Sequence, residues 1–196
     1  MSSQYTELQL DALRELANIG SGTASTALSG MLGRSVDIDV PNAQALPFAE
    51  AVESVGPAEE EMTGIVLGIV GDMRGTVLLL IPPADADALC RMLGVGPDDE
   101  FALSALGEIG NIVGTSYINA LAGMTGMEID PTPPATTTDM LGAIAATVLA
   151  GAAQTGDVAL MLDSNLTVEG EDCSISFFLV PDRGGVDQLL ARLGLS

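Results

Sequence analysis

Histidine and lysine are both missing from this chain of 196 residues. Without His, the chain has no Ser-His or Cys-His nucleophile pair and no imidazole metal ligand. Without Lys, it has neither the lysine of a phosphate-binding loop nor a residue that forms a Schiff base. Any catalysis must therefore rest on carboxylates, amides, hydroxyls or the six Arg residues, or on groups that a partner supplies.

Positive charge is scarce as well, because 27 acidic residues stand against 6 arginines and give a formal net charge of −21. A surface this acidic repels nucleic acid and anionic membranes, so neither is an expected partner. Strong acidity without Lys is typical of a salt-rich cytosol, where a short Debye length screens the repulsion between like charges. A high-GC genome that favours Arg over Lys would explain the same composition.

Cysteines and long apolar runs are also rare. Cys90 and Cys173 stand apart in apolar surroundings without metal-ligand spacing, so we expect buried free thiols in a reducing compartment. The N-terminus lacks the basic and apolar segments of a signal peptide, and the longest uncharged apolar run, 141–153, is too short to span a bilayer. These features predict a cytoplasmic protein without membrane insertion.

What the chain does contain is an internal repeat. Residues 11–41 align with residues 104–134 without a gap, and 12 of the 31 aligned positions are identical. A weaker similarity links residues 75–94 with residues 173–194. Two tandem copies of about a hundred residues predict an internal pseudo-twofold axis, with each copy burying its apolar face against the other.

Both copies show the order helix, strand, helix, two strands, helix. The predicted segments are 6–32, 35–41, 48–54, 63–71, 74–82 and 84–93 in the first copy, and about 100–125, 127–134, 138–153, 157–170, 172–181 and 184–193 in the second. Thr6 and Gln9 form a possible capping box at the first helix. The pattern predicts an α+β fold, an α/β sandwich of helices over paired three-stranded units. We expect a single domain over 1–196, with repeats at about 6–95 and 98–196.

A narrow polar strip recurs on the first helix of each copy. At about 100° per residue, the first strip holds Asp11, Glu15, Asn18 and Gly22, and the second holds Ser104, Glu108, Asn111 and Thr115. Apolar residues occupy the opposite half of both helices, so the strips are expected to face solvent. Because Asn is a poor helix former with no cap to make in mid-helix, its return beside the same Glu argues for a function. An inert pair left by divergence of the repeats is the alternative.

This pattern resembles the signature of the CheC family of chemotaxis phosphatases, which has CheC, CheX and FliY types. The signature is Asp or Ser, then Glu four positions later, Asn three positions further and Pro 23 positions beyond the Asn. The matching residues are Asp11, Glu15, Asn18 and Pro41 in the first copy and Ser104, Glu108, Asn111 and Pro134 in the second. Two complete motifs, and a chain that stops at Ser196, favour the CheC type over one-site CheX types and longer FliY types.

The resemblance implies hydrolysis of the aspartyl phosphate on the response regulator CheY, and binding of CheD, a deamidase that modifies chemoreceptors. The regulator would supply Mg²⁺ and a lysine, so we expect this chain to hold no cofactor and no metal of its own. An amide can accept a hydrogen bond from the attacking water and donate one to a phosphoryl oxygen, which suits Asn18 and Asn111 to the catalytic role. Glu15 and Glu108 would bind the regulator's lysine.

The remaining signature residues are expected to support these four. Asp11 and Ser104 would assist the contact one turn earlier on the helix, and Pro41 and Pro134 would fix the turn after the extended segment. The segment Gly20-Ser21-Gly22 has two glycines that would be able to kink the first helix. An adaptor that regulates CheD or CheY by binding alone is the alternative function, and a motor-switch component is a weaker one.

Overall fold

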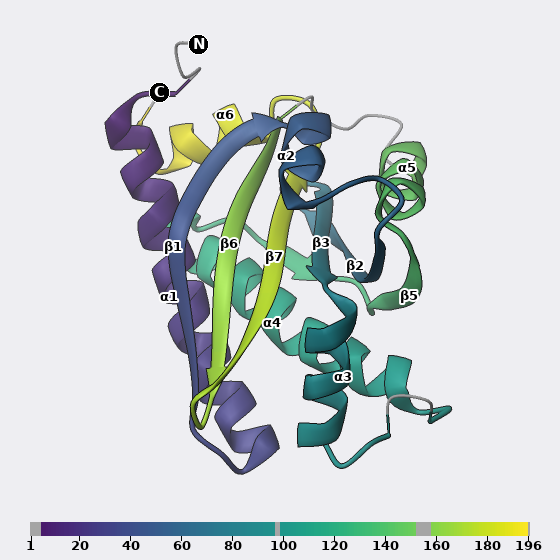
Figure 1. Cartoon of the computed structure of the whole chain (residues 1–196). Helices are drawn as coiled ribbons and strands as arrows, with labels where there is room; N and C mark the ends of the chain where they lie inside the picture. The colour runs from purple at the N-terminus through teal and green to yellow at the C-terminus, as the bar shows by residue number, and fades with distance from the viewer. Residues whose placement is uncertain (1–4, 97–98, 152–157, 196) are drawn as a thin grey trace.

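The computed structural model describes residues 5–96, 99–151 and 158–195 (Figure 1). The helices in this part of the chain are α1 (Glu7–Leu32), α2 (Phe48–Val55), α3 (Pro83–Met92), α4 (Ala102–Thr125), α5 (Leu141–Gly151) and α6 (Gly185–Arg192). The strands are β1 (Val36–Pro47), β2 (Glu61–Gly71), β3 (Gly75–Ile81), β4 (Ile129–Pro131), β5 (Ala135–Met140), β6 (Val158–Val168) and β7 (Glu171–Pro181).

The strands form one antiparallel sheet with helices packed on both faces (Figure 1). The strand order is β1-β6-β7-β3-β2-β4, and β5 also pairs with β2. Residues of α1, α3, α4 and α6 share a large apolar cluster with one face of the sheet, and residues of α2 and α5 share a smaller cluster with the other. The predicted α+β sandwich is therefore confirmed.

The two copies interleave within this sheet. β1 of the first copy pairs with β6 of the second, and β4 and β5 of the second copy pair with β2 of the first. The hairpins β2–β3 and β6–β7 meet through the antiparallel pair β3–β7. Because each copy contributes the same strand to that central pair, the pseudo-twofold axis passes through it. The exact limits of the repeats, about 6–95 and 98–196, stay a prediction.

Helix α1 begins at the predicted capping box. The Thr6 Oγ1 accepts a hydrogen bond from the Gln9 N–H at 3.3 Å, and the Gln9 Oε1 accepts one from the Thr6 N–H at 2.8 Å. Gln9 Nε2 also donates to the carbonyl of Leu195 at 2.8 Å, which ties the start of α1 to the end of the described chain. The helix is continuous through residues 20–22, and Gly33 caps its C-terminal end with φ of 64°.

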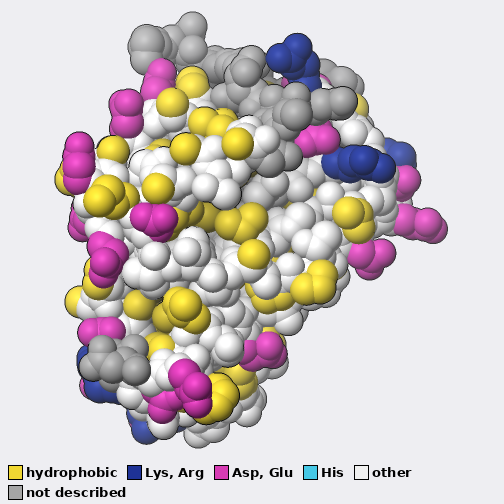
Figure 2. Space-filling model, turned by 90° about the vertical axis from the view of Figure 1, so that its right-hand side faces the viewer, with side chains coloured by type: hydrophobic (Ala, Val, Ile, Leu, Met, Phe, Trp, Pro, Cys, Tyr) yellow, Lys and Arg dark blue, Asp and Glu magenta, His cyan; other side chains and the backbone are white. Residues whose placement is uncertain are grey.

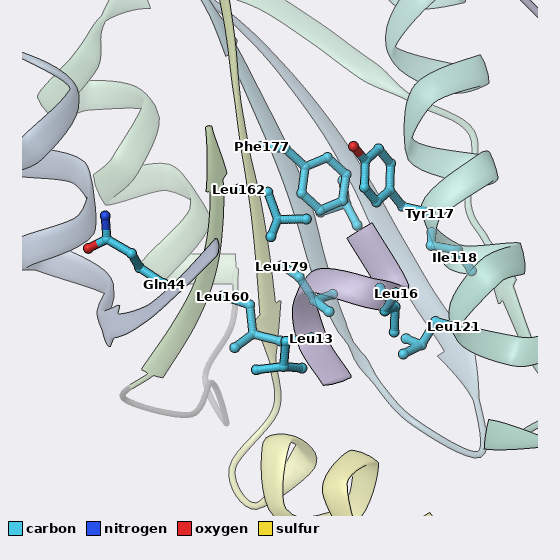
Figure 3. A pocket seen from close by; sticks show the side chains of 11 residues that line it. Leu13, Leu16, Gln44, Tyr117, Ile118, Leu121, Leu160, Leu162, Phe177 and Leu179 are labelled. Carbon is cyan, nitrogen blue, oxygen red and sulfur yellow. The ribbon is translucent and has the colours of Figure 1, made fainter. Parts of the chain in front are cut away.

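Helix α1 packs closely against α4 at Gly20. A Cβ at this position would lie 2.7 Å from the ring of Tyr117, so the close approach requires glycine. Tyr117 is buried and its ring lies against that of Phe177 in β7, with ring centroids 4.4 Å apart (Figure 3). Burial raises the pKa of Tyr117 to about 12. This contact fixes the position of α1 relative to α4 and the sheet.

The first extended segment is longer than predicted. β1 does not end at Pro41 but continues to Pro47, pairing along β6 with a register shift between Asp39 and Asn42. Pro41 therefore falls at an irregularity in an edge strand, where a residue without an N–H is tolerated. The predicted turn at this proline is wrong, because the chain passes it without leaving the sheet.

The second copy contains a strand that the sequence did not predict. Residues 135–140 form β5, where a helix was expected to begin at residue 138, and α5 starts only at Leu141. Three consecutive β-branched threonines favour the extended chain, and their backbone pairs with β2. Pro134 lies in the connection that leads into β5. The predicted continuation of the helix to residue 153 lies outside the described residues.

The other predicted elements are confirmed. Both hairpins, the short helix α2 and the closing helices α3 and α6 lie where the sequence placed them. Cys90 and Cys173 are buried free thiols, and burial raises the pKa of Cys173 to about 11. In the part of the chain that the structure describes, no helix has the length and hydropathy needed to cross a membrane.

Candidate functional site

The first polar strip lies on the open face of α1. Its four members, Asp11, Glu15, Asn18 and Gly22, are all exposed. Leu13 and Leu16 of the same helix are buried and point toward the sheet, where they line a small apolar cavity with residues of β6 and β7 (Figure 3). Burial of this opposite side holds the helix on the sheet, so the Glu and Asn side chains project from a fixed support.

The second strip, on α4, has the same order but is less open. Ser104 and Glu108 are exposed, whereas Asn111 and Thr115 are half-buried. The Thr115 hydroxyl donates to the Asn111 Oδ1 at 3.5 Å, a long hydrogen bond. In the first copy the equivalent of Thr115 is Gly22, which has no hydroxyl to offer. The amide of Asn111 is therefore more restrained than its counterpart in α1.

The residues one turn before the Glu also differ between the copies. The Asp11 carboxylate forms an ion pair with Arg14, with 2.6 Å between Oδ1 and Nη1. Both side chains are largely exposed, so the pair contributes at most about 1 kcal/mol. In α4 the equivalent positions are Ser104 and Gly107, which cannot form such a pair. In the structure without a partner, the Asp11 carboxylate pairs with Arg14. Its expected role, to assist the contact that Glu15 makes with the partner, stays a prediction.

The chemistry available on these strips is that of amides and carboxylates. Both cysteines are buried and burial raises their pKa, so neither supplies a thiolate nucleophile at neutral pH. Among the residues that the structure describes, no three His, Cys, Asp or Glu side chains are grouped so as to hold a metal ion. The Glu–Asn pairs lie on the outward sides of their helices, where a macromolecule can reach them.

The surface of the protein carries little positive charge. Figure 2 shows the side of the molecule away from α1, where acidic side chains are spread with few basic ones between them. Arg14, paired with Asp11, is the cation nearest along the chain to the first Glu–Asn pair. A partner that approaches these strips with a cationic group would therefore be attracted by the field of the whole protein.

Two exposed apolar residues were passed over in the reasoning from sequence. Leu8 in α1 and Phe101 at the start of α4 are both highly exposed, and they occupy equivalent positions in the two copies. Extending the gapless repeat by three residues before Asp11 and Ser104 would have aligned them.

Comparison with solved structures defines the class of fold. FliY from Thermotoga maritima superposes with a TM-score of 0.74 at 21% identity, over 97% of this chain and 98% of that one. The FliM middle domain from H. pylori gives a TM-score of 0.72 at 16% identity, over 96% of this chain and 99% of that one. At these identities the likeness establishes the fold alone, which is the one shared by these FliY and FliM domains.

Sequence comparison then establishes the family. The model of the CheC-like family matches residues 8–43 and 101–137. The CheY-P phosphatase CheC of Bacillus subtilis (strain 168) is 33% identical over 97% of this chain and 96% of its own length. The flagellar motor switch phosphatase FliY of the same organism is 28% identical over 66% of this chain and 35% of its own length. The chain belongs to the CheC-like family, which confirms the resemblance and places it among the chemotaxis phosphatases.

Proposed function

We propose that this protein hydrolyses the aspartyl phosphate of a CheY receiver domain at two sites, one on α1 and one on α4. A single observation carries the proposal. The same Glu–Asn pair stands on the accessible face of two equivalent helices, in a chain related over nearly its full length to a CheY-P phosphatase.

Asn18 and Asn111 are assigned the catalytic role. In the proposed reaction the oxygen of a water molecule bonds to phosphorus while the bond from phosphorus to the aspartyl oxygen breaks, giving inorganic phosphate and a free carboxylate. The Asn Oδ1 accepts a hydrogen bond from the water, and the Nδ2 donates one to a phosphoryl oxygen. A rate gain of roughly tenfold to a thousandfold needs only about 1.4–4 kcal/mol, which one well-placed amide is able to supply.

Glu15 and Glu108 are assigned the anchoring role. A carboxylate beside a phosphoryl group is repelled by it, whereas a carboxylate that pairs with a lysine of the receiver gains a charge-assisted hydrogen bond. Each Glu is three residues before its Asn, so both side chains share one helix face and the anchor sets the reach of the amide. Mg²⁺ on the receiver would neutralise the phosphoryl oxygens, and this chain is proposed to supply no metal.

The proposal is tested by the decay of the phosphorylated receiver. The CheY-like receiver domains encoded in the same genome are phosphorylated with labelled acetyl phosphate, and loss of label is followed with and without this protein at low and high KCl. We expect faster decay with at least one receiver. An unchanged half-life with every receiver at a stoichiometric excess of this protein would contradict the proposal, and binding without faster decay would identify an adaptor.

CheD is proposed as a second partner, and the family resemblance is its only support. Purified CheD from the same genome should co-elute with this protein in size-exclusion chromatography, and more so when phosphorylated CheY is present. Separate elution under both conditions would remove CheD from the account. These encounters are proposed to take place in the cytoplasm.

A further inference from the structure

The polar strips continue into exposed apolar residues. Leu8 is 65% exposed and Phe101 is 62% exposed, the two highest values among the large apolar side chains of the described residues. Exposure of an apolar side chain to water is unfavourable, and its burial in a complex lowers the free energy in proportion to the apolar area covered.

The two exposed apolar residues occupy equivalent positions in the internal repeat. Leu8 and Phe101 are 93 positions apart, the same offset that aligns the two Glu–Asn pairs. The two segments that match the CheC-like family model also begin at these residues, since they cover 8–43 and 101–137. The type of side chain is kept while its identity differs, as expected of a contact that needs apolar area and not one particular shape.

Their direction on the helix agrees with the polar strips. Leu8 is seven residues before Glu15 and Phe101 is seven before Glu108, which places each about 20° from its Glu around the helix axis. The distance along the axis from Leu8 to Asn18 is about 15 Å. A standard interface buries about 800 Å² on each partner, a patch with a radius of roughly 16 Å. One receiver domain is therefore able to cover the apolar residue, the Glu and the Asn together.

We infer that Leu8 and Phe101 are docking residues, which bind an apolar patch on the receiver next to its lysine and phosphorylated aspartate. This inference rests on the proposed function, and it names the residues that set the affinity of each site for the receiver. On the other side of the Asn the strip carries Gly22 or Thr115, which offer little apolar area. Ile19 beside Asn18 is exposed, but its equivalent Ile112 is half-buried against the core, so the exposed apolar area common to both sites lies at the N-terminal end.

The occupant is a receiver domain and not a second copy of this chain or a membrane. Each chain carries a net charge of −21, so two chains repel each other and an anionic bilayer repels both. Glu15 lies two helical turns after Leu8. A receiver that carries a lysine beside an apolar patch therefore matches this surface, with its lysine at the Glu and its apolar patch at the Leu.

The test uses the full chain and a receiver made stably phosphate-like with beryllofluoride, so that binding is measured without turnover. The double variant Leu8→Ala/Phe101→Ala should raise the Kd about tenfold, the size of a truncated interface anchor. Its decay rate for phosphorylated receiver at saturating concentration should stay that of the parent chain. The variant Leu8→Met/Phe101→Leu, which retains apolar area, should keep most of the affinity.

The control is Met140→Ala/Leu149→Ala, which removes two other exposed apolar side chains, of 56% and 47% exposure, outside α1 and α4. It should leave the Kd unchanged. An unchanged Kd in the Leu8/Phe101 variant would overturn the inference but not the hydrolysis proposal. The same would follow if the variant changed the oligomeric state of the free chain and left the Kd unchanged. Failure of the proposed function would be seen separately, as binding by the parent chain without faster decay.

Discussion

At the scale of single residues, each strip combines two side chains of different chemistry. The exposed Glu carries charge and is suited to holding a cation of the partner, whereas the neighbouring Asn is neutral and is suited to holding water. Leu8 and Phe101 add apolar area at one end. The two sites are not identical, because Asn111 is half-buried and accepts a hydrogen bond from Thr115 while Asn18 is exposed.

Removal of charge from the anchoring residues should weaken binding. Replacing Glu15 and Glu108 with Gln keeps the size and helix propensity of the side chains but removes the charge-assisted contact. We expect the Kd for beryllofluoride-treated receiver to rise about 10- to 100-fold, measured by isothermal titration calorimetry. The matched control Glu53→Gln changes an exposed acid on α2, outside both strips, and should leave the Kd unchanged. Equal affinity of the Glu15/Glu108 variant and the parent would refute the anchoring role.

Tyr117 should make the stability of the protein fall at alkaline pH. Burial raises its pKa from 10 to about 12, so its contribution is complete below pH 10 and is lost as pH rises toward 12. At pH 11 the loss is about 1 kcal/mol relative to pH 8. Urea unfolding of the parent and of Tyr117→Phe at both pH values measures it, and the variant should lose less. Parallel losses in the two proteins would show that Tyr117 does not cause the effect.

At the scale of elements, the contact between α1 and α4 determines where the strips lie. At Gly20, two residues beyond Asn18, the backbone of α1 lies against Tyr117 of α4, which is six residues beyond Asn111. A change in this contact would shift both helices and therefore both sites. The glycines of α1 are thus not equivalent, since Gly20 is buried against α4 and Gly22 is exposed on the strip.

Alanine substitutions at these two glycines should have opposite effects on stability. Gly20→Ala would place a Cβ 2.7 Å from the Tyr117 ring, and overpacking of this kind costs about 1–3 kcal/mol. Gly22→Ala meets no atom within 4 Å and should stabilise the helix by about 0.5–1 kcal/mol. Urea denaturation gives both values. If Gly20→Ala were as stable as the parent, the tight packing of α1 on α4 would be wrong.

The elements that the sequence predicted correctly are those specified by local signals. α1 has a capping box, a continuous apolar face and a terminal glycine, all visible in the chain. β5 was missed because its threonines are mostly exposed and polar, and its pairing with β2 joins segments about seventy residues apart. The extension of β1 past Pro41 was missed for a related reason, because only the neighbouring β6 keeps that segment extended.

The same distinction holds within the candidate site. Helical periodicity and the repeat were enough to place the strips on the outer side of α1 and α4. They were not enough to predict that Asn111 is half-buried or that Asp11 pairs with Arg14, since these depend on neighbouring elements and on side-chain rotamers. Leu8 and Phe101 were within reach of the sequence, because the repeat extends to them, but only their exposure distinguishes them from core residues.

At the scale of the whole molecule, two features act together: the interleaved sheet and the acidic surface. Each copy needs strands of the other to complete its part of the sheet, so the two sites are carried by one structure. That structure holds 27 acidic residues against 6 arginines, and only two ion pairs are found among the described residues. Most of the negative charge is therefore left to repel itself, unless ions screen it.

Salt should accordingly stabilise the fold. Two unit charges 10 Å apart in water repel each other by about 0.4 kcal/mol, so screening many such pairs should raise the free energy of unfolding by on the order of 2 kcal/mol. Urea unfolding in KCl between about 0.05 and 2 M, over which the Debye length falls from more than about 10 Å to about 2 Å, measures this gain. A gain complete by about 0.5 M indicates screening, and one that grows steadily to 2 M indicates salt exclusion. Constant stability would contradict the predicted adaptation to salt.

The central claim is that two amide side chains accelerate hydrolysis on a docked partner, and the double variant Asn18→Ala/Asn111→Ala tests it most directly. The decay of labelled phosphorylated receiver is measured at saturating concentrations of the parent, of this variant and of Asn165→Ala, which alters an exposed Asn of β6 outside α1 and α4. We predict that the double variant binds beryllofluoride-treated receiver as tightly as the parent but loses roughly tenfold to a thousandfold in rate, while Asn165→Ala keeps both. Turnover at the parental rate in the double variant would contradict it.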